Sequence, residues 1–129
     1  PDLHISVNGG IASLKDARAH LERGLDGVMI GRAAYHQPGD ILCAADPEIY
    51  GAGAVSDPAE AARAMLPYIE NHLSAGGRLH QVTRHMLGLF AGRPGARAWR
   101  RKLSEEAHRD SAGPQLVEQA LKLVEPVAA

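Results

Sequence analysis

The chain has 129 residues, of which 45% are hydrophobic and 22% charged, a composition typical of a globular protein. Its formal net charge of −1 gives no general sign of nucleic-acid binding. The sole cysteine, Cys43, excludes an internal disulfide and favours a reducing cytoplasm. No apolar run approaches the roughly 18 residues of a membrane span. Because the chain begins with Pro1 and runs almost at once into a strand-like segment, we expect that its true N-terminus lies upstream.

The first third of the chain alternates between strand-like and helical segments. Residues 4–7 are rich in strand-forming side chains and end in the turn signal Asn8-Gly9-Gly10. Ser13 then predicts a helix start, and Gly24 predicts its end. Residues 27–30 form a continuous apolar run, typical of a buried parallel strand, before Gly31-Arg32 and another helical turn. This order predicts an α/β fold with parallel strands.

The middle of the chain, residues 38–56, shows no clear periodicity and predicts a linker with one helical turn around Ile41 and Leu42. We therefore expect βα units over residues 1–42, a linker over 43–56 and a helical domain over 57–129.

The helical domain is expected to contain four helices. The first begins at residues 57–60, and Pro67 is expected to kink it rather than end it. The second would present an apolar face made of Leu79, Val82, Met86 and Leu89-Phe90. The third runs from residue 96 to about 108, and the fourth from 114 to 124.

Two glycine turns, each expected at the carboxyl end of a strand, predict a phosphate-binding half-site. Glycine lets the backbone approach an anion closely, and an arginine can add a charge-assisted contact. In an eight-stranded (β/α)8 barrel, the loops after the last two strands commonly bind phosphate. The residues that would form the half-site are Asn8, Gly9, Gly10, Gly31 and Arg32. The alternative is that these glycines only make tight turns.

Basic charge is concentrated in one block of the chain. Residues 78–102 contain seven Lys and Arg and no acid, whereas residues 1–77 contain five basic and ten acidic residues. Arg97, Arg100 and Arg101 would project from one side of a helix, a pattern typical of phosphate-backbone binding. The alternative is a solvated face whose arginines pair with acids such as Glu105 and Glu106. Trp99 could stack on a base, but its place on an amphipathic helix favours a core residue.

The remaining chemical groups do not indicate a site. Cys43 has no partner cysteine, and the seven histidines show no metal-ligand spacing, so we expect no metal site and no catalytic thiol. Tyr35, Tyr50 and Tyr68 are expected to serve in packing.

Four runs in the chain resemble the tRNA-dihydrouridine synthases, and more narrowly their A subfamily. The run Asp-Gly-Val-Met-Ile-Gly-Arg at residues 26–32 is similar to one shared across these enzymes. The narrower resemblance rests on Arg-His-Met-Leu-Gly-Leu-Phe at residues 84–90 and on Gly-Ala-Arg-Ala-Trp-Arg-Arg at 95–101. The run Val-Asn-Gly-Gly-Ile at residues 7–11 also looks like this family. The resemblance extends to about Ser104 and leaves the tail uncovered.

This resemblance implies the last two βα units of a flavin-binding TIM (β/α)8 barrel, followed by a C-terminal helical domain. The full-length protein would be a cytoplasmic monomer that uses flavin mononucleotide (FMN) and NADPH to reduce D-loop uridines of tRNA, at positions such as 20 and 20a. Asn8, Gly9, Gly10, Gly31 and Arg32 would hold the flavin phosphate. Arg97 and Arg100, with Arg101 and Arg84, would contact tRNA.

The resemblance also implies that the chemistry lies elsewhere in the full-length protein. The family's catalytic cysteine and the residues around the flavin ring lie upstream of this chain, and Cys43 matches no catalytic position. We therefore expect these 129 residues alone to be inactive. Two alternatives remain open at this stage: a non-catalytic helical RNA-binding module, and another FMN-dependent barrel oxidoreductase that acts on small molecules.

Overall fold

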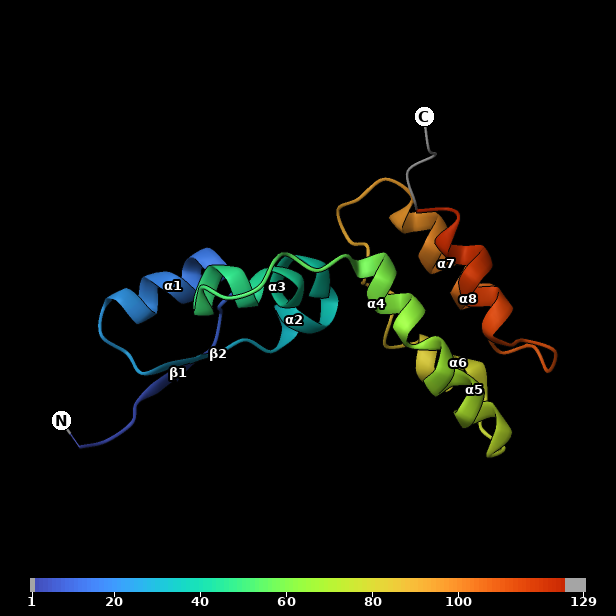
Figure 1. Cartoon of the computed structure of the whole chain (residues 1–129), viewed down its shortest axis with the longest axis horizontal. Helices are drawn as coiled ribbons and strands as arrows, with labels where there is room; N and C mark the ends of the chain where they lie inside the picture. Colours follow the sequence, from blue (N-terminus) through green and yellow to red (C-terminus); the bar gives the residue numbers. More distant parts are fainter. Residues whose placement is uncertain (1, 125–129) are drawn as a thin grey trace. The chain divides into compact units, whose positions relative to one another are not determined.

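The computed structural model describes residues 2–124, and its contacts divide the chain into two compact units, Pro1–Val55 and Ser56–Ala129. Figure 1 shows the two parallel strands in the first unit and only helices and turns in the second. Within the described residues, no helix is both long and apolar enough to span a membrane.

Two short parallel strands organise the first unit. Strand β1 (Ser6–Asn8) pairs with β2 (Gly27–Met29), and Val7 lies opposite Val28. Helix α1 (Leu14–Glu22) connects them, and the Ser13 side chain accepts a hydrogen bond from the Asp16 backbone N–H at 3.1 Å. The predicted helix cap and the parallel pairing are therefore confirmed, and the pairing brings the carboxyl ends of both strands to one edge of the sheet.

The predicted linker was largely wrong, because most of it is helical. Helix α2 (Arg32–His36) leads into α3 (Pro38–Ala45), and a π-helical segment, η1 (Asp46–Tyr50), follows directly. Pro38 suits the first turn of a helix, and the segment buries Ile41 and Cys43 against the rest of the unit. An eight-residue helix is too short to display a clear period, which is why the pattern was missed. Within the predicted linker, only residues 51–56 lack regular structure.

Two of the predicted helices in the second unit are shorter than expected. Pro67 ends the first one: α4 (Pro58–Ala64) stops at Met65 and α5 (Leu66–Ser74) starts anew. Proline cannot donate the backbone hydrogen bond, and its ring collides with the carbonyl group four residues earlier. Helix α6 (Leu79–Thr83) also ends early, and residues 84–93 continue as successive tight turns, such as Met86 N–H to Thr83 C=O at 2.8 Å.

Helices α7 (Ala96–Glu106) and α8 (Pro114–Leu121) complete the second unit, as predicted, and pack against each other. Helix α7 follows Gly95, whose φ is +86° and where a Cβ would overlap the backbone oxygen of Leu123. The core is continuous across all five helices and the turns, and its members are Ala59, Ala62, Ile69, Leu79, Val82, Met86, Phe90, Trp99, Leu103, Ala107, Leu116, Val117, Ala120 and Leu121.

Candidate functional site

The two glycine turns meet in one hollow at the carboxyl edge of the sheet. Its volume is about 410 Å³, and its lining contains all five residues predicted for the phosphate half-site: Asn8, Gly9, Gly10, Gly31 and Arg32. The parallel pairing of β1 with β2 is what brings the two turns together, because it aligns Asn8 with Met29 at the strand ends. We name this hollow the glycine hollow.

The backbone of the first turn needs glycine. Gly9 and Gly10 have φ values of +115° and +69°, in the left-handed region that other residues rarely adopt. A Cβ at either position would have no atom within 4 Å, so the requirement comes from backbone conformation rather than from crowding. The peptide groups of this turn therefore remain uncovered and open to a ligand.

The electrostatics of the glycine hollow favour an anion. Arg32 is exposed and forms no ion pair within the described part of the chain. None of the described residues that line the glycine hollow is acidic. Helix α2 has only five residues, so its dipole is small and the guanidinium supplies most of the attraction. A hollow with bare peptide groups and one uncompensated arginine fits a phosphate group.

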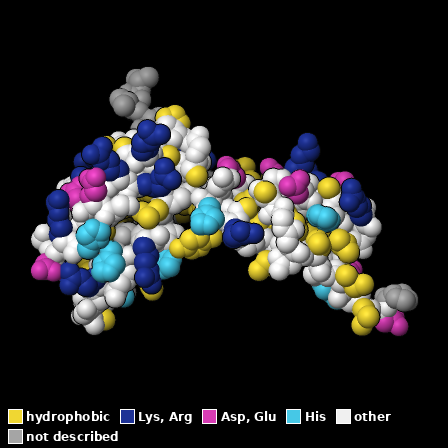
Figure 2. Space-filling model, turned by 180° about the vertical axis from the view of Figure 1, so that it is seen from behind, with side chains coloured by type: hydrophobic (Ala, Val, Ile, Leu, Met, Phe, Trp, Pro, Cys, Tyr) yellow, Lys and Arg dark blue, Asp and Glu magenta, His cyan; other side chains and the backbone are white. Residues whose placement is uncertain are grey.

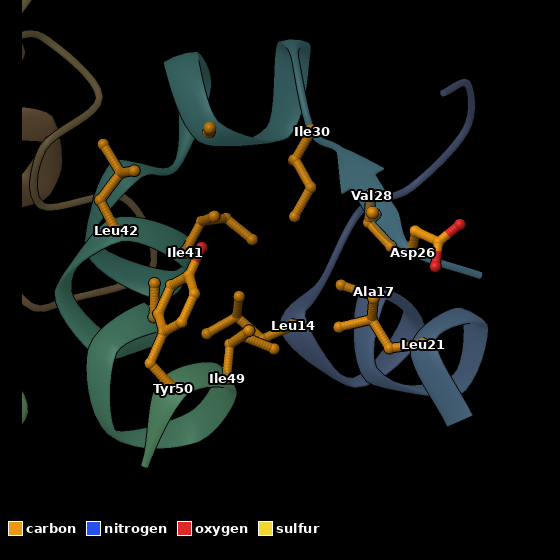
Figure 3. A pocket seen from close by; sticks show the side chains of 13 residues that line it. Leu14, Ala17, Leu21, Asp26, Val28, Ile30, Ile41, Leu42, Ile49 and Tyr50 are labelled. Carbon is orange, nitrogen blue, oxygen red and sulfur yellow. The ribbon is translucent and has the colours of Figure 1, made fainter. Parts of the chain in front are cut away.

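A second hollow of about 370 Å³ lies between the sheet and the helices of the same unit. Figure 3 shows side chains of α1, β2, α3 and η1 around it, including Leu14, Val28, Ile41 and Ile49. Asp26 is its one acidic lining residue, and that carboxylate already accepts the Ile5 backbone N–H at 2.9 Å. We interpret this hollow as an incompletely filled apolar layer without catalytic groups.

The arginines of α7 lie on the surface of the helical unit. Arg97 and Arg100 are exposed and make no ion pair with any residue between 2 and 124. Arg101 does pair with Glu105, Nε to Oε1 at 3.1 Å, as the alternative interpretation expected, but an exposed pair of this kind contributes at most about 1 kcal/mol. Arg84 lies on the turn after α6, and its Nε donates to Nε2 of His85 at 3.1 Å.

Figure 2 shows Lys, Arg and His side chains lying among one another over the helical unit, which is on the left in that view. We use the term basic face for Arg84, Arg97, Arg100 and Arg101.

Trp99 belongs to the core and not to this surface. Its side chain is fully buried, its indole N–H donates to the Met86 carbonyl at 2.9 Å, and its ring meets Phe90 edge to face at 4.8 Å. The core interpretation is confirmed, and stacking on a base would require the residue to leave the interior. The same contacts join α7 to the turns that carry Arg84, so Trp99 ties the two segments of the basic face together.

A third hollow, which no sequence pattern indicated, lies between α6 and α7. It is lined by His80, Thr83, Arg84, Leu87, Leu103, Ser104 and His108, with a volume of about 240 Å³. His80 and His108 are 28 positions apart, so no local spacing could have indicated that they meet. No group of three or more His, Cys, Asp or Glu residues suited to a metal ion occurs among residues 2–124.

Comparison with known proteins decides the family. The model of the family described as dihydrouridine synthase matches residues 1–125. The chain belongs to the dihydrouridine synthase family. Proteins named tRNA-dihydrouridine(20/20a) synthase share 58% identity over 125 residues in Salmonella typhi, 57% over 125 residues in Escherichia coli strain K12 and 53% over 131 residues in Shewanella oneidensis.

These family members are much longer than the chain. The three alignments include 96%, 96% and 97% of this chain but only 37%, 36% and 37% of the relatives. The chain therefore spans little more than a third of the length of the synthases it matches. The match to about residue 125 also extends past Ser104, so the family likeness reaches α8, which the recognised motifs did not include.

Proposed function

We propose that the chain is part of a tRNA-dihydrouridine synthase that reduces uridines at positions 20 and 20a of tRNA in the cytoplasm. The observation that carries the proposal is the convergence of Asn8, Gly9, Gly10, Gly31 and Arg32 on one hollow in a member of the dihydrouridine synthase family. Relatives that are more than 50% identical to the chain are named tRNA-dihydrouridine(20/20a) synthase. Their name supports the choice of substrate and of the two positions.

The glycine hollow would hold the phosphate of FMN. The peptide groups of Gly9 and Gly10 would approach the phosphate oxygens, and Arg32 would supply the balancing charge. When bound, and after reduction by NADPH, the flavin supplies the hydride for the uracil C5=C6 bond. The barrel strands that complete the flavin site and the cysteine that protonates uracil would lie in the rest of the full-length protein. Accordingly, the 129 residues would be inactive by themselves.

The helical unit would hold the tRNA through its basic face. Arg97 and Arg100 lack acidic partners among residues 2–124, so phosphate groups are their natural counterions. Arg101 and Arg84 would add weaker contacts at the edges. Such contacts give affinity with little sequence information, so the choice among uridines would depend on how the tRNA is oriented over the flavin.

The flavin half of the proposal is tested by Gly10→Val in the full-length protein. Valine strongly disfavours the φ of +69° at this position, so the turn should rebuild, and most of the FMN should be lost on purification. Gly24→Val is the matched control, because Gly24 also has a positive φ, +99°, but lies outside the glycine hollow. Flavin absorbance per protein measures the outcome. Full flavin content in the Gly10 variant would contradict the phosphate assignment.

The tRNA half is tested by Arg97→Ala with Arg100→Ala in the full-length protein. Each lost phosphate contact should lower the slope of log affinity against log salt by about one unit, whereas flavin content and flavin reduction by NADPH should not change. The charge-reversed pair, Arg97→Glu with Arg100→Glu, should bind tRNA still more weakly.

Thermal melting of the same variants separates contact from folding. If the arginines only support the helical unit, tRNA binding would fall in step with the melting temperature. Conversion of uridine to dihydrouridine in tRNA that lacks the modification, seen as a mass gain of two hydrogens, reports the activity itself. A protein that binds tRNA but never carries flavin would instead be the non-catalytic RNA-binding module.

A further inference from the structure

The hollow between α6 and α7 differs in character from the basic face beside it. We call it the His80–His108 pocket, after the two imidazole rings that meet edge to face in it, with centroids 6.1 Å apart and planes at 70°. Leu87 and the buried Leu103 supply apolar walls, while Arg84 and Ser104 are exposed at its edge. The lining thus combines aromatic and apolar side chains with the buried Thr83 and with exposed Arg84, Ser104 and His108.

We propose that this pocket receives one unstacked nucleobase of the RNA held by the basic face. The inference rests on the proposed function, because it assumes that the helical unit binds tRNA. Its volume, about 240 Å³, is below the roughly 300–1,000 Å³ of sites for drug-sized ligands, so it suits a single flat ring system. Proteins recognise unpaired RNA bases by stacking them on aromatic rings, histidine included, and by hydrogen bonds to their edges.

The position of the pocket relative to the arginines supports a base. Arg100 and Ser104 are four residues apart on α7, and His108 follows four residues later, just past the helix end. Residues at this spacing lie on one side of a helix. Arg84, on the turn after α6, belongs both to the basic face and to the pocket lining. A strand whose phosphates contact Arg97 and Arg100 would therefore pass beside the pocket.

The chemistry of the lining argues against other occupants. Arg78 is near His108, but its guanidinium is already engaged by the Asp110 carboxylate at 2.6 Å and the His108 carbonyl at 3.1 Å. Among the lining residues, Arg84 is then the one Lys or Arg that could bind a phosphate. Burying an anion against the two leucine side chains would cost free energy. A metal ion would find two imidazoles but no third ligand group within the described residues.

One buried nitrogen in the pocket wall is also unexplained by folding alone. Nδ1 of His80 is buried and has no hydrogen-bond partner among residues 2–124. A buried polar atom without a partner destabilises a fold, and such atoms in native proteins call for a specific explanation. A base that drew the His80 ring toward the pocket would give this nitrogen a hydrogen-bond partner.

The test is Ser104→Leu in the full-length protein, with tRNA affinity measured at two salt concentrations. Ser104 is exposed on α7, and leucine is a better helix former than serine, so the variant should fold while its side chain narrows the pocket. Loss of one stacked base should weaken tRNA binding about fivefold to a hundredfold. Because the lost contact is uncharged, the salt slope should stay unchanged. His108→Ala, which removes an aromatic wall, should weaken binding in the same way.

Ser74→Leu is the matched control, because Ser74 is also exposed on a helix of this unit but does not line the pocket. Unchanged affinity for both Ser104→Leu and His108→Ala would overturn the proposal. So would a flatter salt slope, since that outcome would mean a phosphate near Arg84. If Arg97→Ala with Arg100→Ala weakens binding while the pocket variants do not, only this inference fails. If neither set has an effect, the proposed tRNA role of the helical unit fails as well.

Discussion

The α/β unit and the helical unit differ in how completely they bury their apolar side chains. In the first, Leu3, Ile5, Met29, Leu42 and Tyr50 are all more than half exposed, whereas in the second the largest core side chains, such as Trp99 and Ile69, are fully buried. Among residues 2–124, no further strand pairs with the outer edges of the two-stranded sheet. The comparison shows that the helical unit has a core of its own, whereas the α/β unit leaves much of its apolar surface uncovered.

Hydrogen exchange on the 129-residue chain should show the largest difference between the units. Amides of β1 and β2 have few buried neighbours, so local opening should expose them far more often than those of α7 and α8. We expect protection in α7 and α8 to exceed that in the strands by about a hundredfold or more, which corresponds to about 3 kcal/mol. Equal protection in a proven monomer would mean that the α/β unit is self-sufficient after all.

Trp99→Ala should be the most damaging single change in the helical unit. It removes the largest buried side chain, the edge-to-face contact with Phe90 and the donor to the Met86 carbonyl. Large aromatic-to-alanine changes in a core cost about 3–5 kcal/mol, so chemical denaturation should show most of the unit's stability lost. Arg97→Ala, two positions away but exposed, is the control and should change stability by less than about 0.5 kcal/mol.

Of the three effects predicted here, that of Ser13→Ala should be the smallest. It should act in the α/β unit. It removes the oxygen that accepts the Asp16 N–H at the start of α1, a loss of about 1 kcal/mol for a typical N-cap. Exchange should accelerate in α1 and the strands but not in α7 or α8. Faster exchange throughout the chain would show that the two units unfold together, which would break the comparison.

Local chemistry in the sequence predicted the parts of the fold that depend on neighbouring residues. The Ser13 cap and the glycine turns came from signals that act over a few positions, and the order of the elements then implied parallel strands and the meeting of Gly10 with Gly31. Pro67 was recognised as a disturbance, but whether a proline kinks or ends a helix depends on packing around it. The boundaries of α3 and α6 were missed because short helices give little periodic signal.

Of the candidate site, the glycine hollow could be predicted from the sequence, whereas the His80–His108 pocket could not. The glycine hollow needs only that two successive strands run parallel, which the order of the elements implied. The His80–His108 pocket depends on how α6 and α7 pack in space, and neither histidine is distinctive in its local sequence. Likewise, that Arg101 pairs with Glu105 while Arg100 does not follows from side-chain directions on α7 and not from composition.

The place of Trp99 also determines what intrinsic fluorescence can report. It is the sole tryptophan of the 129 residues, and it is buried among Phe90 and the other core residues of the helical unit. Tryptophan emission therefore follows the folding of that unit alone and does not change when β1 and β2 open. Far-ultraviolet circular dichroism, in contrast, reports the helix content of both units. Denaturation curves from the two probes that fail to coincide would be the optical signature of a chain whose halves fold separately.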